Sequence, residues 1–543
     1  MRVTRILLSV VLITGAIVTH GLASRGQDTA GQGPRDKRDL RLVLLLTVDQ
    51  FRFDYLTRFA EAYDAGLAQL MRDGAVFLNA HLEHYPTVTA PGHAAFGSGA
   101  LPSTSGIIGN DWFDRESGRN VSSVFDPGVS QVGGSSTTSA SPHRLLVTTI
   151  ADELKLAAAA RGPGERTRSI GISLKDRSAI LPVGRSADGA YWYDSSTGEF
   201  VTSSYYAEAL PAWVREFNER RLGHTYAGQA WPFLAPPAAT RTLPAAPGAG
   251  LYSAIYNSPF GNELLTRFAE ATLTAAQLGQ RNAVDVLAIS YSSNDAVGHT
   301  YGPDSPEVRA ITVHTDKAVG ALLEMIDKRV GLDRVLVVFT SDHGVAPLPE
   351  VVAAQRLPGG RITQDDLFGP IRKALEERFG AGQWILGTAG TSPYFNYALM
   401  AEKGVDPAAA QRVAASAAAA VPHVARVYTR DQLLQGNVPS DPFSQRVVQS
   451  FHPQRSGDLE IILEPFWIRQ KTGTTHGTPY PYDTHVPLIF MGNGVASARY
   501  GRYVSLNDVA ATLATWFGIA QPSGSGGRVL SEILTGAPIP TGR

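Results

Sequence analysis

Apolar runs that end in polar residues recur along the chain. They lie in residues 40–56, 168–177, 284–295, 334–344 and 486–492. Continuous apolar runs of this kind predict strands that are buried on both faces. Helical stretches such as residues 304–330 lie between several of them, and residues 505–519 predict a closing amphipathic helix. The alternation predicts an α/β fold with a largely parallel central sheet and helices on both faces.

Two long segments interrupt this alternation. Residues 185–280 contain a loop rich in proline, alanine and glycine, and residues 345–475 contain helix-like and strand-like runs. We expect one catalytic domain over residues 40–543, in which both segments are insertions that cap the face where the strand ends converge. A separate domain is the alternative for the second segment.

The N-terminus has the pattern of a secretory signal peptide. Arg2 and Arg5 precede a 13-residue apolar run, and small residues follow before residue 24. A single-span anchor is the alternative, but the run is shorter than the roughly 20 apolar residues that a span needs. We expect a signal peptide over residues 1–23, a polar linker over residues 24–39, and a periplasmic or secreted protein without a stable membrane anchor.

The composition excludes several classes of protein. The chain has no cysteine, which excludes disulfides, thiol catalysis and lipid attachment near the cleavage site. Apolar residues make up 43% and charged residues 18%, as in an ordinary globular protein. Removing residues 1–23 takes away two arginines and no acid, which moves the formal net charge from −1 to −3. Nothing in this charge points to a nucleic-acid or membrane-surface partner.

Polar residues follow four of the predicted strands. Asp49, Lys175, Asp295 and Asp342 each come at or near the end of an apolar run. Ligand sites of open α/β sheets lie outside the carboxyl ends of the strands, so we expect the chemistry there. Asp295 and His299 are four residues apart and would share one face of a helix, although solvated neighbours show the same spacing.

The remaining candidates have structural alternatives of their own. A buried strand rarely ends in an ionised carboxylate unless the group is paired or binds a metal, which favours Asp342 and His343 as ligands. A helix cap or a turn would also place them there, and Asp49 could cap the next helix. His476 and His485 are the C-terminal candidates, and either could be a hydrogen-bonded core histidine.

Taken together, these residues indicate a metal site. Six oxygen or nitrogen ligands come from separate segments: Asp49, Asp295, His299, Asp342, His343 and one C-terminal histidine. Carboxylate and imidazole suit two divalent cations, with zinc as the first choice and manganese as the alternative. Two ions about 3.5–4 Å apart can stabilise the attacking and leaving oxygens of an in-line phosphoryl transfer.

Seven motifs carry a family resemblance, in the order TVDQFRFD, TVTAPGH, GIIGNDWFD, SLKDR, SNDAVGH, TSDHG and THGTPY. From about Leu42 to Ile519 the chain resembles the alkaline phosphatase superfamily. It is similar to the branch that joins nucleotide pyrophosphatase/phosphodiesterases to the phosphate-irrepressible alkaline phosphatases of Gram-negative bacteria. The resemblance implies an alkaline phosphatase that acts on small-molecule phosphate esters and holds two zinc ions per chain.

The resemblance also implies a ligand set. One zinc would be held by Asp295, His299 and His476, and the other by Asp49, Asp342 and His343, with the nucleophile oxygen completing its shell. His476 is preferred to His485 because a His-Gly pair matches the C-terminal ligand of the family.

By the same resemblance the nucleophile is Thr89, and Thr87 is the preceding turn residue. Pro91 suits the first positions of a helix, whose N–H groups would face the phosphate. A threonine hydroxyl is a poor nucleophile at neutral pH and needs a metal to favour the alkoxide. Attack would give a phosphothreonine intermediate, whereas a plain N-cap is the structural alternative for Thr89.

Three further residues would bind the phosphate. Asn110 matches the asparagine of the branch, and Lys175 and Arg177 would share one side of an extended strand end. A turn is the structural alternative for Asn110, and a solvated run of charges is the alternative for Lys175 and Arg177. We expect a monomeric phosphomonoesterase with weaker diesterase activity. A phosphodiesterase/nucleotide pyrophosphatase with the same metal core, or a non-catalytic metal- or phosphate-binding protein, remains the alternative.

Overall fold

The structure is a computed structural model that describes residues 39–137, 140–162, 166–234 and 240–534. The expected signal peptide (1–23) and most of the expected linker (24–39) lie outside the described residues. The internal contacts separate Met1–Arg35 from Asp36–Arg543, and the second unit is described below. Within the described ranges, no helix has the length and apolarity that crossing a membrane requires.

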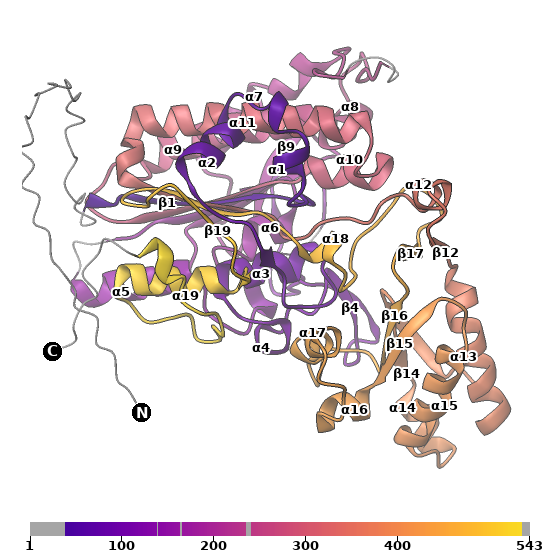
Figure 1. The fold of residues 1–543 in the computed structure, drawn as a ribbon. Coiled ribbons are helices and arrows are strands. Elements are labelled where there is room, and N and C mark those ends of the chain that lie inside the picture. Colours follow the sequence, from indigo (N-terminus) through magenta and orange to yellow (C-terminus); the bar gives the residue numbers. More distant parts are fainter. Residues whose placement is uncertain (1–38, 138–139, 163–165, 235–239, 535–543) are drawn as a thin grey trace, which may run out of the picture. The chain divides into compact units, whose positions relative to one another are not determined.

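The centre of this unit is a sheet to which the described residues contribute ten strands (Figure 1). In spatial order they are β19 (Ala498–Tyr500), β2 (Ala75–Phe77), β18 (Leu488–Gly492), β11 (Val335–Thr340), β1 (Leu42–Val48), β10 (Asp285–Tyr291), β7 (Ser169–Ser173), β8 (Gly189–Asp194), β9 (Glu199–Ser203) and β6 (Gln131–Val132). The five strands from β11 to β8 run parallel, and antiparallel β18 and β9 flank them. The predicted α/β fold with a largely parallel sheet is confirmed.

Helices cover both faces of this sheet (Figure 1). On one face lie α1 (Tyr55–Arg58), α2 (Gly66–Asp73), α7 (Ala212–Glu219), α8 (Ala249–Tyr256), α9 (Pro259–Ala276), α10 (Ser293–Tyr301) and α11 (Pro306–Val330). On the other lie α3 (Thr89–Ser98), α4 (Pro102–Ser105), α5 (Ile150–Arg161), α6 (Asp176–Ile180) and α19 (Asp508–Phe517). The predicted helices over residues 304–330 and 505–519 correspond to α11 and α19.

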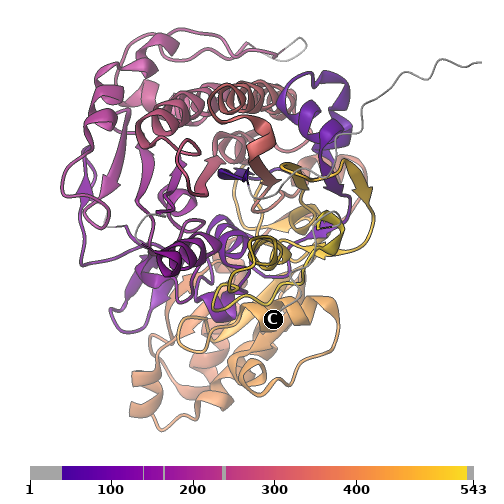
Figure 2. The same ribbon diagram turned by 90° about the vertical axis from the view of Figure 1, so that its left-hand side faces the viewer.

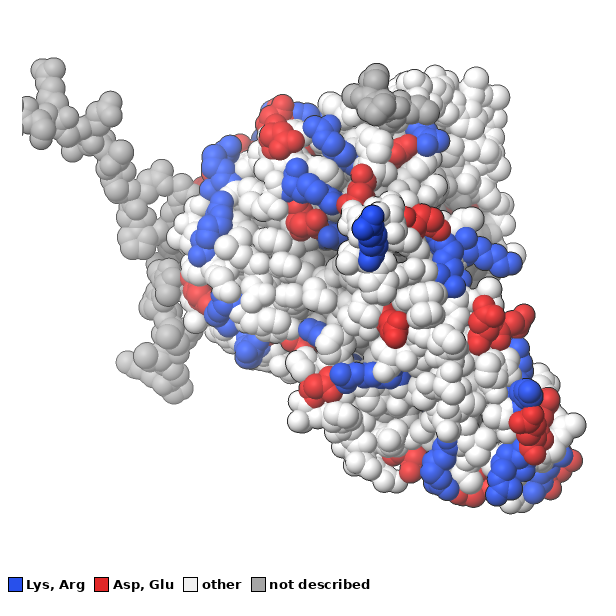
Figure 3. All heavy atoms as spheres, turned by 45° about the vertical axis from the view of Figure 1, so that its right-hand side comes forward, with Lys and Arg blue, Asp and Glu red and all other residues white. Residues whose placement is uncertain are grey.

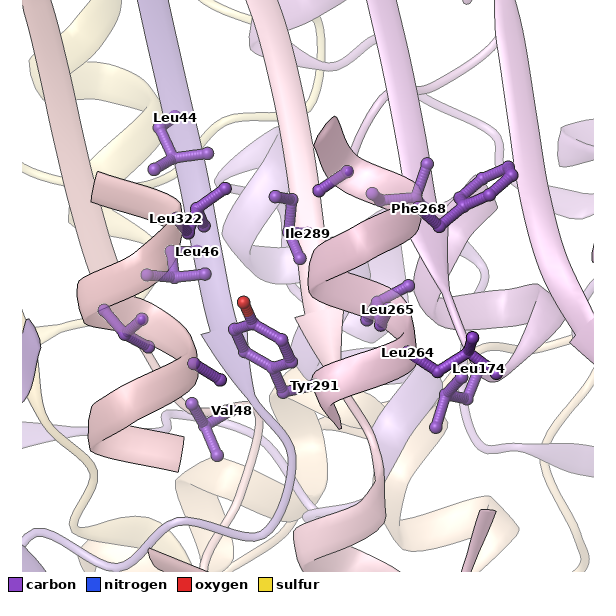
Figure 4. Packing of buried hydrophobic residues seen from close by; sticks show 14 of the residues in the cluster. Leu44, Leu46, Val48, Leu174, Leu264, Leu265, Phe268, Ile289, Tyr291 and Leu322 are labelled. Atoms are coloured by element: carbon purple, nitrogen blue, oxygen red, sulfur yellow. The ribbon is translucent and has the colours of Figure 1, made fainter. Parts of the chain in front are cut away.

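The strands are apolar throughout because both faces are covered. In β1, Leu44 and Leu46 belong to the apolar layer under α9 and α11, whereas Leu45 belongs to the layer under α3, α5 and α19. Figure 4 shows the first layer, where Ile289 and Tyr291 of β10 lie beside residues of α9. A strand with apolar layers on both sides loses the alternation of a half-exposed strand.

Residues 185–280 differ from the expected capping insertion. Strands β8 and β9 extend the main sheet, and α7, α8 and α9 pack on its first face. The physical reason is the aromatic content of the segment, since Tyr191, Phe200 and Phe268 are all buried in the main core. The rings of Phe200 and Phe268 stack with their centroids 3.8 Å apart.

Residues 345–475 form small elements around a core of their own. They are α12 (Pro349–Ala354), β12 (Gly360–Arg361), α13 (Gln364–Phe379), β13 (Ile385–Ala389), β14 (Ser392–Phe395), α14 (Tyr397–Glu402), α15 (Pro407–Ala419), β15 (Val424–Thr429), α16 (Arg430–Gln435), α17 (Pro442–Ser450), β16 (Leu459–Leu463) and β17 (Trp467–Ile468). In both ribbon views this segment lies on the side of α3 and α4, away from α9 and α11 (Figures 1 and 2).

The remaining strands and the remaining α-helix of the described residues are short. They are the pair β3 (Ala80–His81) and β20 (Val504–Ser505), the pair β4 (Asp111–Asp114) and β5 (Arg119–Ser122), and α18 (Pro481–Thr484). On the face that Figure 3 shows, basic and acidic side chains are interspersed. Such a mixed face offers no single-sign field that would attract a polyanion.

One histidine is buried between these elements without a hydrogen bond. His84 follows β3 and is 0% exposed, and neither of its ring nitrogens has a hydrogen-bond partner among the described residues. Burial, with a smaller contribution from the charge of Arg446, lowers the pKa of His84 from 6.5 to about 3. Protonation of His84 therefore opposes folding below pH 6.5.

We predict that His84→Leu makes the protein more resistant to acid. The unfolded chain binds a proton at His84 below pH 6.5 and the folded protein binds it only near pH 3. His84 alone therefore lowers the free energy of unfolding of the wild-type protein by about 1.4 kcal/mol per pH unit over that window. Denaturant unfolding at pH 7 and pH 5 should show a relative gain of about 2 kcal/mol for the variant at pH 5.

The matched control is His143→Leu, because the side chain of His143 is exposed. This control should show no comparable difference between the two pH values. A wild-type protein and a His84→Leu variant that lose stability in parallel would contradict the prediction.

Candidate metal and phosphate site

Four neighbouring parallel strands deliver their polar residues to one edge of the sheet. Lys175 follows β7, Asp295 lies in the first turn of α10 after β10, Asp49 follows β1 and Asp342 follows β11. All four residues are at most 6% exposed. The sequence placed the chemistry at these four strand ends, and the structure brings them together.

The first group of possible metal ligands is Asp49, Asp342 and His343. One oxygen or nitrogen atom of each lies within 4.8 Å of the others. Three buried atoms in this group, Asp49 Oδ1, Asp342 Oδ2 and His343 Nε2, have no hydrogen-bond partner among the described residues. Unsatisfied buried acceptors are rare, and a bound cation satisfies them. This donor set fits a divalent cation such as zinc.

The second group gathers around Asp295. His343 and His476 each bring a nitrogen within the same 4.8 Å limit, and their rings stack with centroids 3.5 Å apart. His299 Nε2 lies 3.1 Å from Asp295 Oδ1. His343 therefore lies between the two groups, a position that the resemblance does not imply. His485 lies elsewhere, stacked between Phe53 and His81.

Backbone carbonyls orient the three histidines in the same way. Nδ1 lies 2.9 Å from the Gly344 oxygen in His343, 2.8 Å from the Thr87 oxygen in His476 and 2.8 Å from the Thr474 oxygen in His299. A ring that donates from Nδ1 presents the lone pair of Nε2, which is the form that binds a cation. Thr87 therefore serves the site through its carbonyl oxygen.

Lys175 is the basic side chain between the carboxylates. Its Nζ donates to Asp49 Oδ2 at 2.7 Å and to Asp295 Oδ2 at 2.6 Å. Burial, reinforced by the negative charge of Asp342, raises the pKa of Asp49 to about 6. Burial also acts to raise the pKa of Asp295, but Lys175 and His299 outweigh it and hold that pKa well below its usual value. The ammonium group of Lys175 does not by itself balance three buried carboxylates, and His299 adds its charge beside Asp295.

Helix α3, which begins at the predicted nucleophile, packs against one carboxylate of the first group. Thr89 is the first residue of α3 and is 1% exposed. One turn later, Gly92 packs against Asp342 so closely that a Cβ atom at this position would lie 2.3 Å from the Asp342 carbonyl oxygen. The side-chain oxygen of Asn110 accepts from the Ala90 N–H at 2.8 Å, which turns its amide NH₂ away from the helix.

The sequence led us to expect Lys175 and Arg177 on one side of an extended strand end, and this prediction is wrong. Lys175 is extended, but α6 begins at Asp176 and places Arg177 in its first turn. Lys175 faces carboxylates, whereas Arg177 is 3.7 Å from Asp176 and its buried Nε has no hydrogen-bond partner among the described residues. Burial raises the pKa of Tyr256 at the end of α8, and the charges of Lys175 and Arg177 act against that rise. The sequence gave no reason to select this tyrosine.

A cavity of about 370 Å³ adjoins the site. His299, His476 and Asn110 form part of its wall. The rest is largely apolar. Tyr85 and Ile108 line it from the main unit, and residues 345–475 contribute Tyr394, Phe451, Ile461 and Trp467. Residues 345–475, the second expected insertion, therefore line one side of the cavity beside the site.

Comparison with known proteins decides the family. The sequence matches the family described as type I phosphodiesterase / nucleotide pyrophosphatase over residues 43–179 and 184–485, which include both ligand groups. The chain belongs to this family.

Two relatives that match this chain over nearly their full length are named alkaline phosphatases. Alkaline phosphatase PafA of Elizabethkingia meningoseptica is 32% identical over 96% of this chain and 98% of its own length. Alkaline phosphatase PhoV of Synechococcus elongatus is 34% identical over 91% and 93%. The crystal structure of PafA has a TM-score of 0.85 and covers 92% of this chain and 99% of its own. Within the type I phosphodiesterase / nucleotide pyrophosphatase family, the chain is therefore an alkaline phosphatase-like enzyme.

A variant of PafA has also been solved, with a TM-score of 0.83 and 32% identity to this chain. Four of its residues are replaced: a threonine, an asparagine, a lysine and an arginine. Thr89, Asn110, Lys175 and Arg177 occur here in the same order. The threonine–asparagine and lysine–arginine spacings are also the same in the two family members.

The close approach of Gly92 to Asp342 gives a stability prediction. Gly92→Ala should lower the free energy of unfolding by about 1–3 kcal/mol, because an added Cβ must displace backbone rather than a flexible side chain. Denaturant unfolding measures the change. Gly250→Ala is the matched control, since a Cβ there meets nothing within 4 Å, and it should be neutral or stabilise by up to about 1 kcal/mol. Equal stabilities for the two variants would contradict the packing account.

Proposed function

We propose that this chain is an exported alkaline phosphatase that hydrolyses phosphate monoesters at a site for two divalent cations, with zinc as the first choice. The observation that carries the proposal is the set of unsatisfied Asp49, Asp342 and His343 atoms beside Asp295 and its histidines. The full-length likeness to alkaline phosphatases supports it. Export rests on the pattern of residues 1–23, and a monomer remains our expectation.

We assign one cation to Asp49, Asp342 and His343, and the other to Asp295, His299 and His476. When bound, the cations would lower the pKa of a coordinated hydroxyl and stabilise negative charge on a leaving oxygen. Besides its proposed place as a cation ligand, Asp295 accepts a hydrogen bond from Lys175 Nζ, which holds the carboxylate in position. The position of His343 between the groups would keep the two ions close together.

We assign the nucleophile to Thr89. Its hydroxyl releases its proton to solvent water, and its oxygen forms a bond to phosphorus while the ester P–O bond breaks and the leaving oxygen takes a proton from water. Water then cleaves the phosphothreonine and releases phosphate, so phosphorus undergoes two displacements. The place of Thr89 at the start of α3 and the packing of Gly92 against Asp342 support this assignment.

Asn110, Lys175 and Arg177 would bind the non-bridging oxygens of the phosphate. Asn110 has its amide oxygen engaged by Ala90, so its NH₂ is the group left to donate. Lys175 places an ammonium group between the two ligand groups, where a phosphoryl dianion would lie. The fourfold PafA variant supports the choice of these residues together with Thr89. A monoester dianion carries one more negative charge than a diester and gains more from these donors.

A phosphodiesterase reaction is the second candidate. The observation that favours it is the largely apolar cavity beside His299, His476 and Asn110, which could receive a second ester group. The two candidates share the ligand groups and the nucleophile, and differ in what stabilises the part of the substrate beyond the reacting oxygens.

Relative turnover of two substrates tests the proposal. On the zinc-loaded protein, kcat/KM for p-nitrophenyl phosphate should exceed kcat/KM for bis-p-nitrophenyl phosphate. Lys175→Ala should lower the monoester value by about 10²-fold and the diester value by much less, because the lost ammonium group acts on the extra charge. Lys328→Ala is the control, since Lys328 pairs with Glu324 on the exposed surface of α11, and it should change neither value.

A wild-type preference for the diester would reassign the chain as a phosphodiesterase. Equal losses for both substrates in Lys175→Ala would show that Lys175 does not discriminate between them.

A further inference from the structure

Gln50 has an unusual backbone conformation at the centre of the site. It directly follows Asp49, is 2% exposed and has a φ of 62°. Non-glycine residues rarely adopt this left-handed region, and where they do the surrounding structure must hold them there. The sequence motif singles out Asp49 but gives no role to its neighbour.

Gln50 contacts both ligand groups by different parts of the residue. Its backbone N–H donates to Asp342 Oδ1 at 3.2 Å, in the first group. Its side-chain Nε2 donates to Asp295 Oδ1 at 2.6 Å, in the second group. A single residue thus connects the carboxylates that follow β11 and β10, across the strand end of β1 that separates them.

Helix α10 leaves room for this side chain at one glycine. A Cβ atom on Gly298 would lie 1.8 Å from Gln50 Oε1. Gly298 lies between Asp295 and His299 in α10, so the amide is held against the helix that carries two proposed ligands. The amide oxygen has no hydrogen-bond partner among the described residues, so the contact to Asp295 through Nε2 is the polar contact that fixes the amide.

We propose that Gln50 is a positioning residue that sets the distance between the two ligand groups and orients Asp295 through its side chain. This inference rests on the proposed two-cation site. A neutral amide is suited to the task, because it donates a hydrogen bond to a carboxylate without adding a charge that would compete with a cation. An acid at this position would repel Asp295, and an ammonium group would duplicate Lys175.

The backbone and the side chain of Gln50 contact different ligand groups, which predicts a selective effect of side-chain removal on metal affinity. Gln50→Gly removes the contact to Asp295 but keeps the N–H that donates to Asp342, and glycine adopts the observed φ readily. Loss of an outer contact of this kind typically weakens metal binding 10- to 100-fold. We therefore expect the affinity for one of two zinc ions to fall about 10- to 100-fold, and the affinity for the other to change by less than about threefold.

Zinc titration of chelator-treated protein, with a chromophoric competing chelator, measures both affinities without relying on turnover. Gly298→Ala provides an independent variant, because its Cβ would push the Gln50 amide away from Asp295. Gly298→Ala should lower the affinity for the same zinc ion and leave the affinity for the other unchanged. Gly250→Ala, whose Cβ meets nothing within 4 Å in α8, is the control and should bind both ions as the wild type does. Thermal unfolding of the metal-free variants checks that each is folded.

The outcomes separate the inference from the function on which it rests. A wild-type protein that binds fewer than two zinc ions would overturn the proposed two-cation site itself. A wild-type protein that binds two, with both affinities unchanged in Gln50→Gly and Gly298→Ala, would overturn the role of Gln50. An equal loss of affinity for both ions in a folded variant would also overturn the role of Gln50, since the side chain would then have no selective action on the Asp295 group.

Discussion

The structure depends on keeping three buried carboxylates at one edge of a parallel sheet. Asp49, Asp295 and Asp342 are at most 6% exposed, and Lys175 bonds directly to two of them. Burying ionised carboxylates is costly unless opposite charge compensates them, and the raised pKa of Asp49 reports that imbalance. The same imbalance would favour binding of divalent cations at this edge, so the electrostatic strain of the fold and its proposed chemistry would have one cause.

The surrounding structure prevents this edge from relaxing. Parallel strands with apolar layers on both faces fix where each strand ends, and carbonyl oxygens fix the rings of His299, His343 and His476. Close packing supplies the rest, since Gly92 lets α3 reach Asp342 and Gly298 leaves room for the Gln50 amide. Preorganised groups of this kind act on a developing charge without having to move first.

The sequence predicts the part of this arrangement that depends on local patterns. Continuous apolar runs predicted the parallel strands, and the polar residues after them are the ones that the structure brings together at one edge of the sheet. Tyr256 and the sheet-forming β8 and β9 lay in a segment whose long proline- and alanine-rich loop suggested an insertion. Arg177 was placed on a strand because a two-residue spacing does not show that α6 starts at Asp176. His343 between the groups, and Gln50 with its left-handed backbone, depend on contacts between distant segments, which no local pattern encodes.

The most direct test of the account is a crystal structure of the zinc-loaded protein, with anomalous diffraction measured on both sides of the zinc absorption edge. The account predicts two anomalous peaks about 3.5–4 Å apart. One should be bound by Asp49, Asp342 and His343, and the other by Asp295, His299 and His476. A single peak, or zinc bound away from these side chains while Lys175 still bridges Asp49 and Asp295, would contradict it.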